Sequence, residues 1–84
     1  MPSGFAINRH LVFVLKNGAV VVDWGNGWGA DLDRGEFIRF TDQDFSHSIQ
    51  DDELESMKRM GLVVDYDQSQ VYLSYMPEPP QAKS

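Results

Sequence analysis

Two apolar runs separated by a short turn place the strongest constraint on the fold. The runs are L-V-F-V-L at residues 11–15 and V-V-V at residues 20–22, and Asn17 and Gly18 lie between them. Asn-Gly between two β-branched runs predicts a β-hairpin with a two-residue type I′ turn, in which both turn residues have positive φ. Because consecutive residues of a strand point to opposite faces, both faces of this hairpin are apolar and both need a cover.

The second cover raises the question of oligomeric state. The chain has 84 residues. A domain of that size buries only about 60–65% of the surface that its unfolded form exposes, so one copy has little chain to spare for two covers. We expect either that the rest of the chain covers both faces or that a homodimer covers one of them.

A second Asn-Gly pair extends the hairpin into a meander. It lies within D-W-G-N-G-W-G-A-D, residues 23–31, which holds both tryptophans of the chain. A tight turn there would pair Gly25 with Trp28 and Trp24 with Gly29. A Trp ring over a cross-strand glycine covers backbone that the glycine leaves bare, so this pairing predicts a packed turn.

The remaining segments alternate strand, loop and helix patterns. The predicted elements, in chain order, are a strand at 30–32, a turn at 33–35, a strand at 36–40, a polar loop at 41–50, a helix at 51–61 and a hairpin of strands at 62–66 and 71–76. The pattern predicts an α+β fold: an antiparallel sheet of four to six strands, built from an N-terminal meander and a C-terminal hairpin, with one helix packed on a face. We expect a single α+β domain at residues 1–76 and a flexible Pro-rich tail at residues 77–84.

Charge and composition exclude several classes of function. Thirteen Asp and Glu residues against seven Lys and Arg give a net charge of −6, which opposes the phosphate backbone of nucleic acids and favours a partner protein with a basic surface. The chain has no cysteine, so disulfides, thiolate nucleophiles and Cys-based metal sites are excluded. The apolar run at 11–15 is too short for a signal sequence or a membrane span. We expect a cytoplasmic protein with no direct nucleic-acid binding and no membrane insertion.

The acidic segment 42–53, D-Q-D-F-S-H-S-I-Q-D-D-E, matches part of the twelve-residue calcium loop. The oxygen ligands at its first, third, fifth and twelfth positions would be Asp42, Asp44, Ser46 and Glu53. His47 replaces the glycine that the sixth position needs for a sharp turn. We therefore expect no metal and no cofactor, and we keep a small-ligand or calcium-binding domain that uses this loop as the alternative.

The apolar face of the predicted helix carries one carboxylate. Leu54, Met57 and Met60 fall on one face, a pattern typical of a core helix, and Glu53 falls between Met60 and Met57 on a helical wheel. A carboxylate there needs a partner. A cation, Arg39, a free backbone N–H group or solvent at the first turn would serve.

No segment carries an established catalytic pattern. The sequence has no G-x-x-x-x-G-K-S/T and no H-E-x-x-H, and its glycine-rich stretch at 25–29 does not match a dinucleotide-binding turn. Asp44, Ser46 and His47 are close in sequence, but a triad is defined by three-dimensional roles, and neighbours in a loop point in different directions. We expect that the protein is not an enzyme, and the alternative is a minor activity that uses His47.

These observations favour a protein-interaction function. Tryptophan is enriched at binding hot spots, and glycines make the two rings hard to bury fully. We predict a small acidic interaction module, an inhibitor, immunity-type or accessory protein, that binds a basic partner surface through an aromatic and acidic patch. The predicted anchors are Trp24 and Trp28, and the predicted acidic rim consists of Asp31, Asp33, Asp42, Asp44, Asp51 and Asp52. A domain of undefined role without catalytic activity is the remaining alternative.

Overall fold

The computed structural model describes residues 4–79 and confirms the predicted α+β fold class. The elements are β1 (Phe5–Asn8), the 3₁₀ helix η1 (Arg9–Leu11), β2 (Val12–Leu15), β3 (Val20–Gly25), β4 (Trp28–Asp31), β5 (Glu36–Arg39), β6 (Phe45–Ser48), α1 (Asp51–Arg59), β7 (Val63–Tyr66) and β8 (Gln70–Leu73). The strands form two antiparallel sheets, a three-stranded one in the order β1-β8-β7 and a five-stranded one in the order β5-β4-β3-β2-β6. The expected sheet is therefore divided into two, with the meander in the larger one.

Two strands that the sequence pattern did not predict complete these sheets. β1 pairs with β8, and Phe5–Asn8 lie opposite Gln70–Leu73. β6 lies within the predicted loop at 41–50 and pairs with β2, where Phe13 lies opposite Ser48. Both segments run beside strands whose backbone N–H and C=O groups would otherwise lack partners. This need for backbone hydrogen bonds, rather than local propensity, makes them strands.

The first Asn-Gly pair forms a longer turn than the sequence predicts. Leu15 donates its N–H to the carbonyl oxygen of Ala19 (2.8 Å) and accepts one from Gly18 (2.9 Å), so the loop holds three residues, Lys16 to Gly18. Of these, only Gly18 has positive φ, at +91°. The Asn17 side chain closes the loop by accepting the Ala19 N–H at 2.9 Å. The predicted two-residue type I′ turn is therefore wrong here, and a three-residue loop with glycine in the left-handed region takes its place.

The second Asn-Gly pair forms the tight turn that the first does not. Asn26 and Gly27 have φ of +57° and +81°, as a type I′ turn requires, and Gly25 pairs with Trp28 as predicted. The next predicted pair is wrong, because the register shifts between Asp23 and Gly25 and places Gly29 opposite Asp23. Trp24 is thus the extra residue of a β-bulge.

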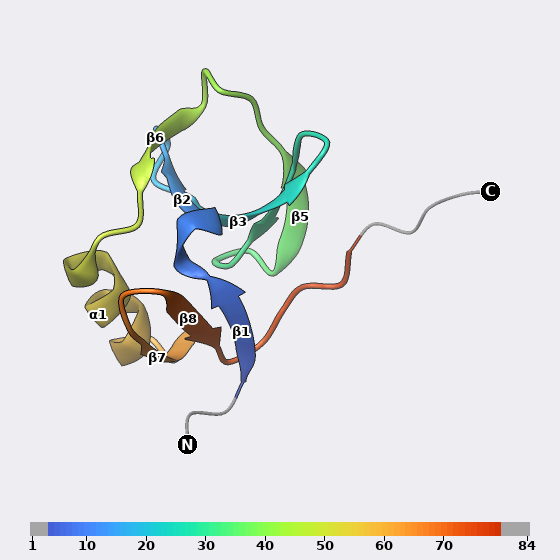
Figure 1. Ribbon diagram of the computed structural model, residues 1–84. Coiled ribbons are helices and arrows are strands. Elements are labelled where there is room, and N and C mark those ends of the chain that lie inside the picture. Colours follow the sequence, from blue (N-terminus) through green and yellow to red (C-terminus); the bar gives the residue numbers. More distant parts are fainter. Residues whose placement is uncertain (1–3, 80–84) are drawn as a thin grey trace.

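The main core lies between the five-stranded sheet and a layer made of α1 and the three-stranded sheet. Figure 1 shows α1, β7 and β8 gathered on one side of β2 and β3. The buried residues of this core are Val12, Val14, Val22, Ala30, Leu32, Ile49, Leu54, Met57, Val63, Val71 and Leu73. Full burial of a Val, Leu, Ile or Met side chain contributes about 1.5–3 kcal/mol to the free energy of unfolding. Because so many of these side chains meet here, α1 and the three-stranded sheet are the main cover of this face of the β2–β3 hairpin.

The opposite face of the five-stranded sheet is covered by the connection from β5 to β6, which arches over it in Figure 1. The Phe13 ring packs edge-on against Phe45 at 5.1 Å and against Phe40 at 6.4 Å between ring centroids. Beneath them Val21 is 0% exposed. One chain therefore covers both hairpin faces, which removes the argument for a homodimer, and oligomeric state stays a prediction.

The end of the chain is packed further than the predicted domain boundary at residue 76. Met76 packs against the main core, and Pro77, the first residue assigned to the tail, is buried. Residues 80–84 of the predicted tail lie outside the described residues, so its flexibility stays a prediction.

A substitution at Gly29 tests whether the Phe40 ring covers the second face of the β2–β3 hairpin. A Cβ at Gly29 would lie 2.8 Å from Cε1 of Phe40 and 3.1 Å from Cβ of Val21. We expect Gly29→Ala to lower the free energy of unfolding by about 1–3 kcal/mol, because the Phe40 ring must move. Alanine is otherwise preferred to glycine in a strand, so a loss of stability would come from the clash. Urea unfolding measures this change.

The matched control is the same substitution beside a shortened ring. In a Phe40→Leu protein, Gly29→Ala should cost clearly less, because the clashing ring atoms are gone. An equal cost in both backgrounds would show that Phe40 does not cover this face.

Candidate functional site

The two tryptophans occupy different environments. Trp24, in the bulge of β3, packs edge-on against Phe37 with ring centroids 5.1 Å apart, and 46% of its surface is exposed. Trp28 on β4 is half-buried, and the guanidinium of Arg39 lies 4.4 Å from its ring centroid. Trp24 therefore keeps a free aromatic surface, while the half-buried Trp28 has the guanidinium of its cross-strand neighbour Arg39 over its ring.

The acidic residues predicted as one rim are dispersed over the molecule. Asp31 is buried, with 2% of its surface exposed, and its Oδ1 accepts the backbone N–H groups of Asp33 and Arg34, both at 3.0 Å. It therefore holds the turn after β4 and is not part of an exposed rim. Asp42 is exposed, and Asp44 closes its own turn by accepting the Thr41 N–H at 2.9 Å.

Asp51 is exposed but is engaged by Arg9. The Arg9 guanidinium forms an ion pair with Asp51, donates to the carbonyl oxygen of Asp67 at 3.0 Å, and lies 5.8 Å from the ring centroid of Tyr66. The Asp67 carboxylate accepts backbone N–H bonds from Ser69 and Gln70, which lower its pKa. This cluster ties η1, the β7–β8 turn and the start of α1 together.

The segment 42–53 does not wrap into a calcium loop. Its centre is strand β6, so Ser46 is held in the sheet. Glu53 is engaged by protein groups: its Oε1 accepts the Gln50 N–H at 2.8 Å and caps α1, and its Oε2 lies 2.8 Å from Nε2 of His47. Within residues 4–79, no three His, Asp or Glu side chains are placed to hold a metal ion.

His47 is the partner that the Glu53 carboxylate needs on the apolar side of the helix. Ser46 Oγ lies 3.0 Å from Nδ1 of the same ring, so Ser46, His47 and Glu53 form a hydrogen-bonded chain. Sequence reasoning considered Asp44 as the third member and missed Glu53, which folding brings close. The chain joins β6 to the first turn of α1, and the absence of catalysis stays a prediction.

An open groove lies between α1 and the β2–β3 hairpin, and we call it the α1 groove. It has a volume of about 620 Å³. Val14 and Val20 line it from the strands, and Met57 and Met60 line it from the helix. Met60 is 62% exposed, the largest exposed fraction among the big apolar side chains described. Val14 and Met57 are buried, so the accessible apolar surface of the groove comes mainly from Met60 and the half-buried Val20.

The rim of the α1 groove is acidic. Four carboxylates line it, those of Asp33, Asp52, Glu53 and Glu55, against a single guanidinium, that of Arg59. Asp33 and Asp52 belong to the predicted rim, and the structure brings them to one groove. Glu53 and Glu55 were missed as contact residues, although the position of Glu53 beside the two methionines on the helical wheel was a signal for it.

Tyr66 holds one rim residue in place. Its hydroxyl donates a hydrogen bond to Oε2 of Glu55. This bond raises the pKa of Tyr66 to about 12, because ionising the phenol would remove the donated proton; desolvation and repulsion between the phenolate and the Glu55 carboxylate add smaller contributions. Glu55 is thus positioned at the rim by a contact from β7.

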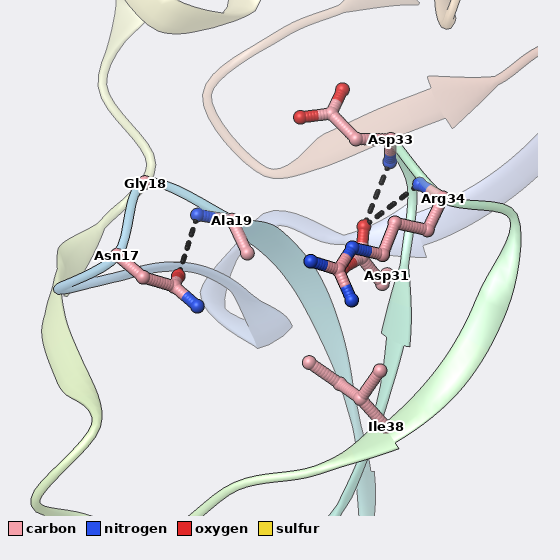
Figure 2. A pocket seen from close by; sticks show the side chains of 7 residues that line it. All are labelled: Asn17, Gly18, Ala19, Asp31, Asp33, Arg34 and Ile38. Atoms are coloured by element: carbon pink, nitrogen blue, oxygen red, sulfur yellow. Dashed lines mark hydrogen bonds between the residues drawn. The ribbon is translucent and has the colours of Figure 1, made fainter.

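A smaller pocket adjoins the α1 groove, and Figure 2 shows it from close by. It has a volume of about 220 Å³ and lies between two turns, with Ile38 at one side. Its lining residues are Asn17, Gly18, Ala19, Asp31, Asp33, Arg34 and Ile38. Gly18 and Asp33 line both the pocket and the α1 groove. We call this cavity the Asp31 pocket, and the two cavities share one wall.

Comparisons with known proteins give no guide to the site. The chain matches no protein-family model, no curated protein and no solved structure. In the part of the chain that the structure describes, no helix is both long enough and apolar enough to cross a membrane. The function must therefore be argued from the geometry of the α1 groove and the Asp31 pocket.

The contact between Tyr66 and Glu55 predicts an alkaline titration. In a Tyr72→Phe, Tyr75→Phe protein, tyrosinate absorbance should show Tyr66 titrating near pH 12, and Glu55→Gln should bring it toward the ordinary value of 10.0. Because the folded-state pKa is raised, this contact stabilises the fold fully below pH 10 and ceases to do so as the pH rises toward 12.

The control for this titration is Asp42→Asn, which removes an exposed carboxylate elsewhere. It should leave the Tyr66 titration unchanged. A first titration near pH 10 in the protein that retains Glu55 would contradict the assigned contact.

The tryptophan environments predict distinct fluorescence. In Trp28→Phe, the remaining Trp24 should emit at longer wavelength and be quenched readily by acrylamide, because nearly half of its surface is exposed. In Trp24→Phe, the half-buried Trp28 should be quenched less. Equal quenching of the two variants would show that the bulge does not expose Trp24.

Proposed function

We propose that this protein is an acidic interaction module that binds a basic surface of a partner protein through the α1 groove. The observation that carries the proposal is the pairing of an apolar floor, in which Met60 is the exposed residue and Met57 is buried beside it, with a rim of four carboxylates and one guanidinium. The proposal covers an inhibitor, an immunity-type protein or an accessory protein, each of which would act by binding without chemistry of its own. The net charge of −6 supports the same class of partner.

The floor and the rim would contribute differently to binding. An apolar side chain of the partner would pack on Met60, whose flexible thioether adapts to irregular shapes and which is already exposed. Lys and Arg side chains around it would pair with Asp52 and Glu55. Exposed ion pairs contribute little each and are screened by salt, so the rim would steer and orient the partner, while the floor would supply most of the affinity.

Trp24 is a second proposed contact outside the groove. Val20 lines the groove, and Trp24 lies four residues further along β3, which is about 13 Å at the usual rise of a strand. A partner of ordinary interface size reaches both, because such an interface covers about 800 Å² of each protein.

Affinity capture with matched variants tests the proposal. The bait is the full chain, compared with a groove variant, Met60→Gln with Glu55→Gln, and with the control Asp42→Asn. We expect a basic protein that the native bait and the control retain and the groove variant loses. Its affinity should fall by at least about tenfold in the groove variant, as the loss of one good apolar contact implies.

Salt dependence gives the second readout. The captured complex should weaken when the ionic strength is raised from 50 to 500 mM, because surface charges are then screened within a few ångströms. A partner that the groove variant binds as tightly as the native chain does would overturn the proposed function. So would a partner whose affinity does not change with ionic strength.

A further inference from the structure

We propose that the Asp31 pocket is a subsite for one cationic side chain, lysine or arginine, of the partner, with the Asp31 carboxylate as its acceptor. The inference rests on the proposed function, because the pocket opens beside the α1 groove. It adds what the groove alone does not specify: a single basic residue of the partner that reaches around the end of the β2–β3 hairpin, because Asp31 shares the sheet face of Val21, opposite the face that carries the α1 groove.

The Asp31 carboxylate is buried, and only one of its two oxygens accepts hydrogen bonds from residues 4–79. Its Oδ1 accepts two backbone N–H bonds, and its Oδ2 accepts none from residues 4–79. Every fully enclosed side-chain nitrogen or oxygen in that range has a hydrogen-bond partner, so the unpartnered Oδ2 keeps some exposure, and Asp31 lines the pocket. With 2% of the residue exposed, the carboxylate has little water around it, and pairing with a cation would offset that cost.

The charges around the pocket leave it negative. Asp31 and Asp33 line it against one cationic group, Arg34, whose side chain crosses in front of Asp31 in the view of Figure 2. Arg34 is in none of the ion pairs formed within residues 4–79. The field of the two carboxylates also reaches Tyr75, whose hydroxyl bonds to the carbonyl oxygen of Leu32 and whose pKa is raised by burial and by both acids.

The pocket lies at the end of the β2–β3 hairpin, on the sheet face opposite the α1 groove, and the two cavities meet at Gly18 and Asp33. Gly18, which both cavities share, is exposed, and a Cβ there would meet no atom within 4 Å, so no neighbouring group crowds this side of the turn. The volume of about 220 Å³ is several times the roughly 30 Å³ that one water molecule occupies in the liquid. This leaves room for an ammonium or guanidinium group and part of the methylene chain that carries it. Ile38 offers an apolar surface to that stem.

A side-chain cation fits the pocket better than a metal ion. Calcium takes about six to eight oxygen ligands, and no third carboxylate or imidazole joins Asp31 and Asp33 within the described residues. An ammonium or guanidinium needs only one or two acceptors, which a fixed carboxylate with a free oxygen supplies.

The first experiment titrates the protein with n-butylammonium chloride and follows backbone amide shifts by NMR, with n-butanol and sodium chloride as matched controls. We expect saturable shifts confined to the two turns, residues 17–19 and 31–35, with the amine alone. Asp31→Asn keeps an oxygen for both backbone N–H bonds but loses the charge, so it should raise the dissociation constant at least about tenfold. Asp42→Asn should leave it unchanged.

Two results of this titration would overturn the proposal. One is shifts that do not saturate and spread over the acidic surface, and the other is shifts that persist in Asp31→Asn. If Asp31→Asn does not fold, Asp33→Asn serves instead. It removes the second carboxylate from an exposed position and should weaken amine binding about threefold, as loss of a partly exposed charge contact implies. Unchanged binding in that variant would count against the subsite.

The second experiment uses the partner captured through the α1 groove. Asp31→Asn should weaken that partner at least about tenfold, and replacing its inserted lysine or arginine by glutamine should make the Asp31→Asn effect disappear. If the groove variant loses the partner while Asp31→Asn binds normally, the subsite is wrong and the groove stands. If the amine binds at Asp31 while no partner depends on Asp31 or the groove, the pocket takes free amines and both proposals fail.

Discussion

The two-sided apolar hairpin of β2 and β3 is the constraint on which the rest of the structure depends. Val12 and Val22 face one cover and Val21 faces the other, so neither face can be left to water without a cost of several kcal/mol. The chain meets this demand by itself. It places α1 and the three-stranded sheet on one side and the rings of Phe40 and Phe45 on the other.

The α1 groove exists because α1, part of the layer that covers one face of the β2–β3 hairpin, does not extend to the end of the hairpin. A helix of nine residues is about 13 Å long and does not cover the hairpin to its end. Val14 and Val20 therefore meet Met57 and Met60 at an open edge. The first turn of a helix favours acidic side chains, and Asp52 and Glu53 sit there beside the same edge. One element thus sets both the apolar floor and much of the acidic rim.

Sequence reasoning identified the elements whose signal is local. The helix, the left-handed Gly61 just beyond its C-cap, with φ of +84°, and the tight turn at Asn26-Gly27 all follow from the preferences of a few neighbouring residues. β1 and β6 were missed because their strand character comes from distant partners. For the site, Asp33 and Asp52 were predicted as rim residues, but their meeting at one groove depends on how the fold places the start of α1 near the turn that follows β4.

The sequence by itself determined the fold class, the two-sided apolar hairpin, the excess of acidic over basic residues and the absence of thiol chemistry, because these depend on composition and short-range pattern. Only the tertiary structure decided which acids are buried and which are exposed. Asp31 and Asp33 are two residues apart, yet one turn buries the first and leaves the second at a rim. That difference arises from backbone N–H groups and neighbouring strands that surround Asp31 after folding, and no local pattern encodes their positions.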